Sequence, residues 1–377
     1  WGGPQRLMGL AAKESSIKVD MLPRVCEKCG KESGHIICHH RSSHSDAIEC
    51  GGVTVPKIRK GTQRRRLGES TRLPIGSIME VKRRSLNLDR LPERIKAMNE
   101  LLSKMQTPEP IEKGILRAKH NLSVFRDGTA RYDMIDVPVT HFKPSEIGTP
   151  WKKIYELGYH YDMYGKKLKS DSQILELFPQ DFIPSINGKE HLISTCNFVD
   201  DLLTKFYGMK AFYNVKTELD LVGHLGIGLA PHTSGGVLCR IIGWTSASAG
   251  YAHPLFHAAK RRNCDGDEDS IMLLLDGLLN FSRAILPSGR GGQMDAPLVL
   301  STRINPSEID KEALNVDCSW NYSKQFYEST LNQPHPNEVI DLVDLVSNRE
   351  GTIGDVRGYG WTHDSGELDA GPKNSSY

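Results

Sequence analysis

The segment 221–244 is rich in glycine, apolar and β-branched residues, a pattern typical of buried strands joined by tight turns. From Ser270 the pattern changes, because apolar residues recur at helical spacing as far as Phe281 and so predict a helix. Asp269 or Ser270 is its expected N-cap. Since a buried sheet and an apolar helix flank residues 260–269, we expect that polar stretch to be held by a core rather than to lie free in solvent.

Weaker patterns predict the neighbouring elements. Residues 111–144 alternate as strands do, and Asp127-Gly128 within them predicts a hairpin turn. Residues 191–208 have the pattern of a helix. An apolar stripe beginning at Leu91 predicts a further helix, which TPEP ends at residue 107. The stripe, interpreted as core packing, comprises Leu91, Ile95, Met98, Leu102 and Met105.

Residues 260–269 carry the clearest chemical signal, because three cations and Asn263 precede four acidic groups. Side chains two apart in an extended segment point the same way, so Asp265 and Asp267 converge, and Gly266 between them permits a tight bend. Convergent carboxylates suit Mg²⁺, and the preceding cations then lie where metal-bound phosphates must go. The pattern predicts phosphoryl transfer, although an isolated Asp-Gly-Asp is usually a solvated loop. The cations are Lys260, Arg261 and Arg262.

Residues 253–283 closely resemble the large catalytic subunit of the D-family archaeal DNA polymerases, as do GHLGIGLAPHTSGGVLCRIIG before them and RGGQMDAPLV after them. The resemblance extends through 107–142 and 361–373 and covers most of residues 107–377. It implies a mixed α+β fold with two double-psi β-barrels, the catalytic core shared with multisubunit RNA polymerases, and helical insertions. It also implies that the chain is a segment of a much longer subunit.

The resemblance implies template-directed DNA synthesis by nucleotidyl transfer from a dNTP to a primer 3′-hydroxyl. Asp265 and Asp267 would hold the two Mg²⁺ ions of this reaction. Asn263 would orient the loop or add a ligand, and Glu268 and Asp269 would face outward or cap the next helix. The expected substrate and DNA contacts are Lys113, Lys119, His232, Arg240, His257, Lys260, Arg261, Arg262 and Asn263. The two histidines have a structural alternative, because most histidines of this kind are packed or hydrogen-bonded core residues.

Other functions remain open at this stage. The same barrels serve RNA-synthesising polymerases and primases, and the acidic loop does not distinguish ribose from deoxyribose. A non-catalytic, zinc-containing nucleic-acid-binding scaffold is a further alternative. A nuclease ranks last, because the family places its proofreading exonuclease on a smaller subunit. The implied partners are primer–template DNA, dNTPs, that smaller subunit and, through the complete subunit, a sliding clamp.

Half of the eight cysteines lie close together as C-x2-C-x8-C-x11-C, namely Cys26, Cys29, Cys38 and Cys50. Zn²⁺ prefers four tetrahedral thiolate or imidazole ligands, and C-x2-C followed by glycine is a common knuckle. The second pair is irregular, so His39, His40 or His44 is an alternative to Cys38. Four protein ligands leave no open position and therefore indicate a structural zinc. A disulfide is the alternative, disfavoured in a cytoplasmic enzyme.

Charge is strongly segregated along the chain, although the net charge is only +2. Residues 57–104 carry 14 Lys/Arg against 5 Asp/Glu, whereas residues 304–377 carry 5 against 13. The basic run beginning KIRKGTQRRR suits a DNA backbone or is a solvated linker. No run approaches the roughly 20 apolar residues of a membrane span and no secretory leader is visible, so we expect a cytoplasmic location.

These patterns predict five successive regions. They are a zinc module (1–56), a basic connector and helix (57–106), a first barrel with an insertion (107–190), a helix and second barrel with the catalytic loop (191–303), and an acidic segment that continues the core (304–377).

Overall fold

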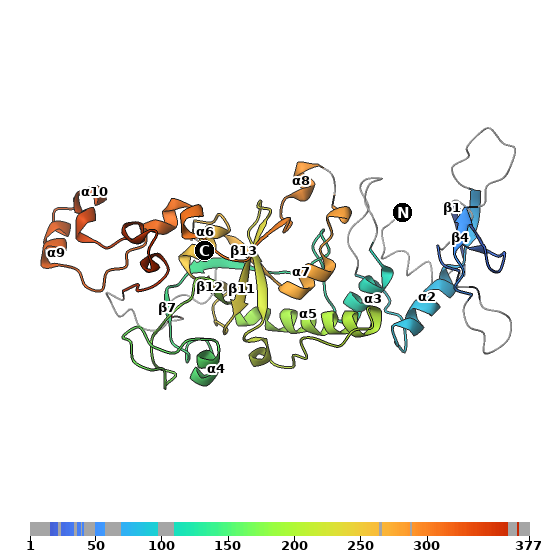
Figure 1. Cartoon of the computed structure of the whole chain (residues 1–377), viewed down its shortest axis with the longest axis horizontal. Helices are drawn as coiled ribbons and strands as arrows, with labels where there is room; N and C mark the ends of the chain where they lie inside the picture. The colour runs from blue at the N-terminus through green and yellow to red at the C-terminus, as the bar shows by residue number, and fades with distance from the viewer. Residues whose placement is uncertain are drawn as a thin grey trace. The chain divides into compact units, whose positions relative to one another are not determined.

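The computed structural model describes residues 16–21, 24–33, 36–38, 40, 50–56, 69–96, 109–263, 266–286, 289–360 and 368 of the 377-residue chain. The chain divides into two compact units, residues 1–95 and residues 96–377. Their elements are labelled and coloured along the chain in Figure 1.

The described part of the first unit contains two small antiparallel sheets and a helix. β1 (Ile17–Met21) pairs with β5 (Glu69–Leu73), and β2 (Arg24–Cys26) lies between β3 (Glu32–Ser33) and β4 (Thr54–Pro56). The helix, α2 (Ile75–Ser85), buries Ile75 and Met79, which lie one turn apart on the same face. The start of the predicted basic connector, residues 57–68, lies outside the described residues.

The helix predicted from Leu91 is wrong where the structure describes it, because residues 89–96 are not helical. Leu91 precedes Pro92, and a proline ring disfavours helical backbone at the residue before it. Arg83 also donates to the carbonyl oxygens of Leu88 and Asp89 and holds the chain in an irregular segment after α2. The rest of the predicted helix falls on residues 97–108, outside the described part of the chain.

The second unit is built on a closed β-barrel of six strands. They are β6 (Tyr132–Pro138), β9 (Asp181–Ile183), β10 (Leu225–Leu229), β11 (Gly235–Ile241), β12 (Ala249–Ala252) and β13 (Glu268–Leu273). They pair in the order β10-β13-β6-β12-β9-β11, and β11 pairs with β10 to close the ring. The β6–β12 and β9–β11 pairs are parallel and the other pairs are antiparallel. Closure pairs every strand on both sides, which makes the barrel a firm support for the loops at its ends.

The barrel interior is packed with apolar side chains. Phe182 of β9 and Met134 of β6 both approach Gly250 of β12, where a Cβ would lie 2.5 Å from Phe182 Cζ and 2.6 Å from Met134 Sδ. Only glycine therefore fits at this position. The ring of Phe182 also packs against Phe256, with 5.7 Å between ring centroids. The interior is therefore a core, and the chemistry must lie at the barrel's ends.

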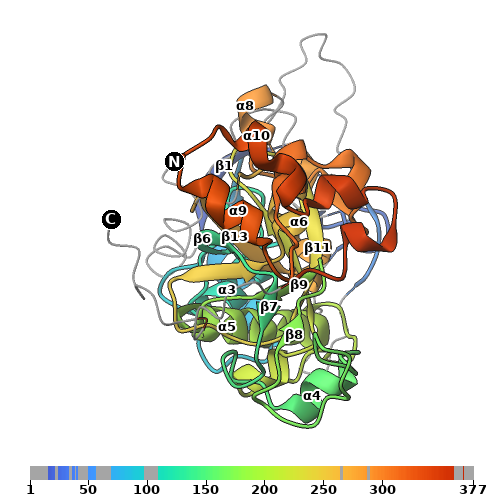
Figure 2. The same cartoon turned by 90° about the vertical axis from the view of Figure 1, so that its left-hand side faces the viewer.

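Helices pack around this barrel. They include α3 (Ile111–Lys119), α5 (Lys189–Asp201), α6 (Pro254–Ala259) and α7 (Leu274–Asn280). α5 contacts β13, α3 and α7, and it lies below the barrel strands in both views (Figures 1 and 2). The π-helical turn η2 (Leu202–Phe206) continues it, so the helix predicted over 191–208 is confirmed.

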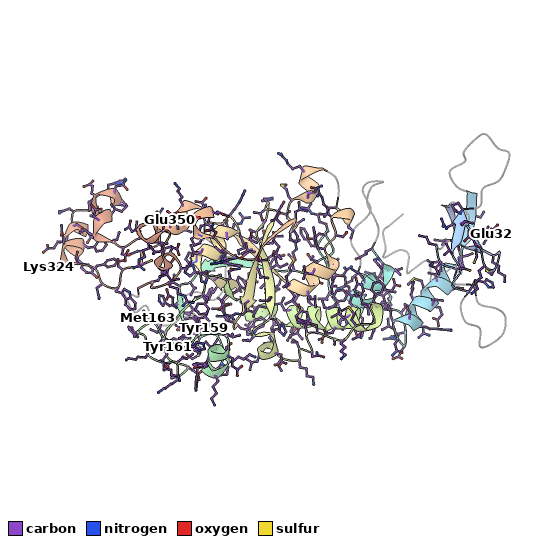
Figure 3. All side chains as sticks on the ribbon, in the orientation of Figure 1. Glu32, Tyr159, Tyr161, Met163, Lys324 and Glu350 are labelled. Atoms are coloured by element: carbon purple, nitrogen blue, oxygen red, sulfur yellow. The ribbon has the colours of Figure 1, made fainter. Side chains whose placement is uncertain are left out.

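Residues 141–178 form an excursion between β6 and β9 whose apolar side chains share a cluster with Ile242, which follows β11, and with Ala249 and Tyr251 of β12. The excursion contains β7 (His141–Phe142), α4 (Trp151–Glu156) and β8 (Leu175–Glu176). Tyr159 stacks on Phe178 with 4.1 Å between ring centroids, and its hydroxyl donates to Asp181 at 2.6 Å. Tyr161, two residues further on, is 65% exposed (Figure 3).

The remaining described elements are short. They are η1 (Ile186–Gly188), η3 (Glu218–Leu221), η4 (Arg283–Ile285), α8 (Arg290–Gln293), β14 (Val299–Ser301), η5 (Pro306–Glu308), η6 (Lys311–Asn315), α9 (Lys324–Thr330), α10 (Pro336–Val339), η7 (Ile340–Leu342), η8 (Val346–Arg349) and η9 (Ile353–Asp355). β14 adds to β11 in parallel. No helix in the described part of the chain is long and apolar enough to cross a membrane.

Two predicted elements are corrected by the structure. The helix expected from Ser270 is a strand as far as Leu273, and α7 begins only at Leu274. Every residue of β13 from Asp269 to Leu273 is buried, so both faces of the strand are covered. A short apolar run of that kind cannot be told from a helix by periodicity. Residues 111–119, expected to be extended, form α3, which follows Pro110.

The mixed α+β fold is confirmed, whereas two double-psi barrels are not. Two strands from the region expected to form the first barrel, β6 and β9, join β10 to β13 in a single closed barrel. Strands that are far apart in the sequence pair across this ring, and local patterning carries no information on such pairing.

Candidate functional site

The acidic loop joins α6 to β13 at one end of the barrel. Cys264 and Asp265 lie outside the described residues, so the position predicted for Asp265 stays a prediction. Gly266 has φ of +93°, a left-handed conformation that glycine adopts without strain. The side chain of Asp267 is 41% exposed, and its Oδ2 lies 3.6 Å from Nη1 of Arg262. The carbonyl oxygen of Asp267 accepts the backbone N–H of Asp136 at 2.9 Å, which ties the loop to β6.

A buried ion pair lies beneath this loop. The ammonium group of Lys260 donates to the carboxylate of Asp269, and the two side chains are 0% and 1% exposed. The same ammonium lies 3.4 Å from Nδ1 of His257 and 4.6 Å from the ring centroid of Phe256. Lys260 therefore neutralises an internal charge, and its ammonium does not face solvent. Asp269, expected to face outward or cap a helix, points inward.

His257 is a neutral member of the same cluster. Burial, and after it the charge of Lys260, hold the pKa of His257 well below its usual value. Its Nε2–H donates to the carbonyl oxygen of Val137 at 3.1 Å, so Nδ1 is left as an acceptor facing Lys260. The imidazole is thus held by the core rather than presented to a substrate.

Asp136 is the residue that sequence reasoning missed. It is completely buried on β6, and its Oδ2 lies 3.7 Å from Nδ1 of His257. Neither carboxylate oxygen has a hydrogen-bond partner among the described residues. Burial raises the pKa of Asp136, the charge of Lys260 lowers it, and the charge of Asp267 raises it again. The only local indication in the sequence is the period-two alternation of a strand, which puts Asp136 on the same buried face of β6 as Met134.

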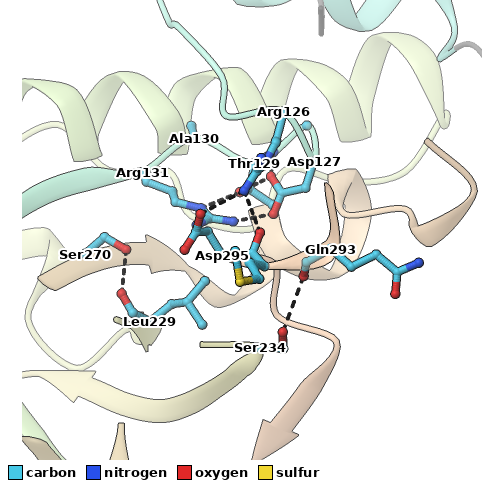
Figure 4. Close-up of polar contacts among 12 residues, drawn as sticks. Arg126, Asp127, Thr129, Ala130, Arg131, Leu229, Ser234, Ser270, Gln293 and Asp295 are labelled. Atoms are coloured by element: carbon cyan, nitrogen blue, oxygen red, sulfur yellow. Dashed lines mark hydrogen bonds and ion pairs between the residues drawn. The ribbon is translucent and has the colours of Figure 1, made fainter. Parts of the chain in front are cut away.

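A cleft opens beside the loop along β13, lined by Asp133, His232, Glu268 and Asp295 among others. His232 is exposed and its backbone N–H donates to Asp295. Figure 4 shows a polar network, of which Arg131 and Asp295 also line this cleft. The network comprises Arg126, Asp127, Thr129, Arg131 and Asp295.

The segment FRDGT (125–129) supplies most of that network. Its backbone forms the predicted turn, in which Phe125 N–H donates to Thr129 O at 2.9 Å, although a helix rather than a strand precedes it. Thr129 Oγ1 donates to Asp127 at 2.7 Å, and Arg131 donates to both residues. The Arg131 guanidinium also lies 4.1 Å from the Phe125 ring centroid. Arg126 donates to Asp295 at 2.7 Å, so the charges of both arginines in this network are paired within the protein.

A second cleft flanks the loop on the side of β14. Arg261, Asn263 and Arg303 line it, together with Asn305 and Glu308 among others. The side chains of Arg261, Asn263 and Arg303 are exposed. These two guanidinium groups and an amide are the groups near the loop best placed to meet an anionic ligand from solvent.

Three predicted contacts lie apart from the loop and have internal partners. Lys113 is buried and donates to the carbonyl oxygen of Leu279 at 2.8 Å. Lys119 pairs with Asp201. Arg240 makes a two-pronged ion pair with Asp181, at 2.8 and 2.7 Å.

The four predicted zinc ligands come together in the first unit. Their ligand atoms all lie within 4.8 Å of one another. The Cys26–Cys50 and Cys29–Cys38 sulfur pairs are 3.7 and 3.6 Å apart. A tetrahedron with Zn–S bonds of about 2.3 Å has sulfurs about 3.8 Å apart, so the cluster fits Zn²⁺.

Backbone geometry supports this cluster. The backbone N–H groups of Cys29 and Lys28 lower the pKa of the Cys26 thiol to about 7, although burial acts against them. His40 is engaged elsewhere, with its Nε2 2.7 Å from Nζ of Lys31. His39 and His44 lie outside the described residues. The described groups therefore favour Cys38 as the fourth ligand.

Comparison with known proteins identifies the family to which the chain is similar. The family model described as DNA polymerase II large subunit DP2, catalytic domain, matches residues 88–377. The DNA polymerase II large subunit of Methanocella arvoryzae is 49% identical over 379 residues, covering 96% of this chain and 32% of its own length. That of Methanothermobacter thermautotrophicus is 47% identical over 378 residues, covering 100% of this chain and 33% of its own length. The chain therefore spans about one third of the length of the curated relatives it matches.

Proposed function

Because this chain belongs to the family of DNA polymerase II large subunits, we propose that it carries the nucleotidyl-transfer site of a template-directed DNA polymerase. The observation that carries the proposal is the loop at the barrel end, where the partly exposed carboxylate of Asp267 lies next to the buried Lys260–Asp269 ion pair. In the reaction, the primer 3′-hydroxyl attacks the α-phosphorus of a dNTP and pyrophosphate leaves. Asp267 and its neighbour Asp265 would hold Mg²⁺.

The residues present fit a divalent cation. Carboxylate oxygens are the ligands that Mg²⁺ prefers, and the partly exposed carboxylate of Asp267 is carried on backbone that is hydrogen-bonded to β6. When bound, the ions would lower the pKa of the attacking hydroxyl and offset charge on the leaving group. Water and nucleotide phosphates would complete the coordination, because two carboxylates are few for two ions.

Phosphate recognition is proposed for the exposed cations on the β14 side. Arg261, Asn263 and Arg303 line one cleft and are open to solvent. Arg262 lies beside Asp267 and donates to the carbonyl oxygen of Pro231, so we assign it to holding the loop. His232, exposed on the other cleft, remains a proposed substrate contact.

The internal partners of the other candidates argue against direct substrate contact. Lys260 and His257 are buried in the charge cluster, and Lys113, Lys119 and Arg240 pair within the fold. We propose that these five residues support the site. For the four cysteines we propose a structural zinc site, since they would surround the ion completely.

The partners follow from the family and are likewise proposals. They are primer–template DNA, dNTPs, a smaller proofreading exonuclease subunit and a sliding clamp reached through the complete subunit. We propose a cytoplasmic, replicative role in an archaeal cell, because the relatives are archaeal DNA polymerase subunits.

Primer extension by the complete two-subunit enzyme tests this proposal. Asp265→Ala and Asp267→Ala should abolish extension while primer–template binding stays within a few-fold. Glu156→Ala, an exposed acidic change on α4, is the matched control and should extend normally. Parallel reactions with dNTPs and rNTPs separate DNA from RNA synthesis. Near-normal extension by Asp267→Ala would remove the proposed site.

A further inference from the structure

Asp136 is a buried carboxylate that the backbone N–H groups of Gly266 and Asp267 approach without reaching hydrogen-bond geometry. Its side chain is completely buried, and neither oxygen has a hydrogen-bond partner among the described residues. The nearest cation, Lys260, already donates to Asp269. A buried charge without hydrogen bonds is strongly unfavourable, and a neutral residue of the same shape would avoid that penalty.

The position of this carboxylate indicates what opposes the penalty. The backbone N–H of Asp136 donates to the carbonyl oxygen of Asp267, so the two residues are adjacent across the β6–loop junction. The charge of Asp267 and the backbone N–H groups of Gly266 and Asp267 all act on the Asp136 carboxylate. The carboxylate is therefore directed at the underside of the acidic loop, with His257 on its other side.

We propose that Asp136 is a positioning residue of the metal site, which supplies a third, buried negative charge beneath the acidic loop and so strengthens divalent-cation binding there. This inference rests on the proposed function, in which Asp267 holds a metal. Lys260 balances Asp269, so the charge of Asp136 is left to act on the loop. A bound cation above the loop would in turn stabilise the buried carboxylate.

A second buried carboxylate provides a matched control. Asp276 on α7 is 0% exposed, like Asp136, but one of its oxygens accepts from Ala130 N–H at 2.8 Å and the other from Asn280 Nδ2 at 2.7 Å. In Asp276→Asn the new NH₂ group replaces one acceptor, so a donor loses its partner and the melting temperature should fall. In Asp136→Asn no such hydrogen bond among the described residues is lost, so the melting temperature should stay or rise.

The test is Mn²⁺ binding to the complete two-subunit protein with primer–template and dNTP, measured as free Mn²⁺ by electron paramagnetic resonance. Asp136→Asn should weaken binding at the loop by roughly 10-fold or more, as expected for residues that support metal ligands. Its melting temperature should not fall, whereas Asp276→Asn should melt lower and bind Mn²⁺ normally.

The possible outcomes separate the two proposals. If Asp136→Asn binds Mn²⁺ with unchanged affinity while Asp267→Ala abolishes binding, the proposed role of Asp136 is overturned and the proposed function stands. A site insensitive to Asp267→Ala would overturn both. A fall in melting temperature like that of Asp276→Asn would assign Asp136 to folding and also overturn the inference.

Discussion

Removing the cation beneath the acidic loop should unfold the barrel at a much lower temperature. In Lys260→Met the carboxylate of Asp269 stays buried, 1% exposed, beside the buried Asp136. Breaking a fully buried ion pair by removing one partner costs about 3–5 kcal/mol. At about 2–4 °C per kcal/mol for a unit of this size, the melting temperature should fall by roughly 6–20 °C.

Differential scanning calorimetry of the complete subunit measures this change, with hydrogen exchange in β6 and β13 identifying the transition of the barrel. Lys260→Met/Asp269→Asn should recover more than half of the loss, because the direct partner of Lys260 no longer carries an unpaired charge, although Asp136 still loses the field of Lys260. Lys324→Met is the control, since its pair with Glu328 has side chains 88% and 60% exposed and should contribute little. A fall below about 2 °C, or a double variant no more stable than the single one, would refute the reasoning.

Three further predictions concern the rest of the chain. Elemental analysis should find about one Zn²⁺ per chain, bound at residues 26–50, and Cys29→Ser should lower zinc content and stability with little effect on the rate of nucleotidyl transfer. Protein that is purified without chelator and contains no zinc would refute the site. Arg64, Arg65 and Arg66 lie outside the described residues, and neutralising all three should reduce the slope of log DNA affinity against log salt concentration by roughly two to three. An unchanged slope would show that this basic run does not contact the DNA backbone. Burial lowers the pKa of His253 to about 3. Below about pH 6.5 the unfolded chain therefore binds a proton that the folded chain does not bind, so the free energy of unfolding should fall as the pH drops below that value. His253→Asn should flatten that loss by up to about 1.4 kcal/mol per pH unit in thermal unfolding, and a profile identical to that of the parent protein would contradict it.

The sequence predicted what depends on neighbouring residues. The zinc-ligand spacing brings four sulfurs together, and helical periodicity located α5. The turn at Asp127-Gly128 follows from local backbone preference. These features are set within a few residues, so a single sequence carries them.

What the sequence could not predict depends on pairing across the barrel. β13 looks helical in the sequence because both of its faces are buried, and the pairing with β10 and β6 that makes it a strand is not local. Lys260 looks like a phosphate ligand until Asp269, nine residues on, turns inward to meet it. Asp136 joins the site only because β6 pairs beside β13, and its distance of more than 120 residues from the loop leaves no local signal.

The measurement that tests the central claim most directly is a change of metal specificity at Asp267. In single-turnover primer extension by the complete two-subunit enzyme, Asp267→Cys replaces a hard oxygen ligand by a thiolate, which prefers softer ions. Extension should be lost with Mg²⁺ and regained in part when Cd²⁺ or Mn²⁺ is added, while Asp267→Ala should stay inactive with all three ions. Extension by Asp267→Cys at the parent rate with Mg²⁺ alone would contradict the account, because the carboxylate could then not be a metal ligand.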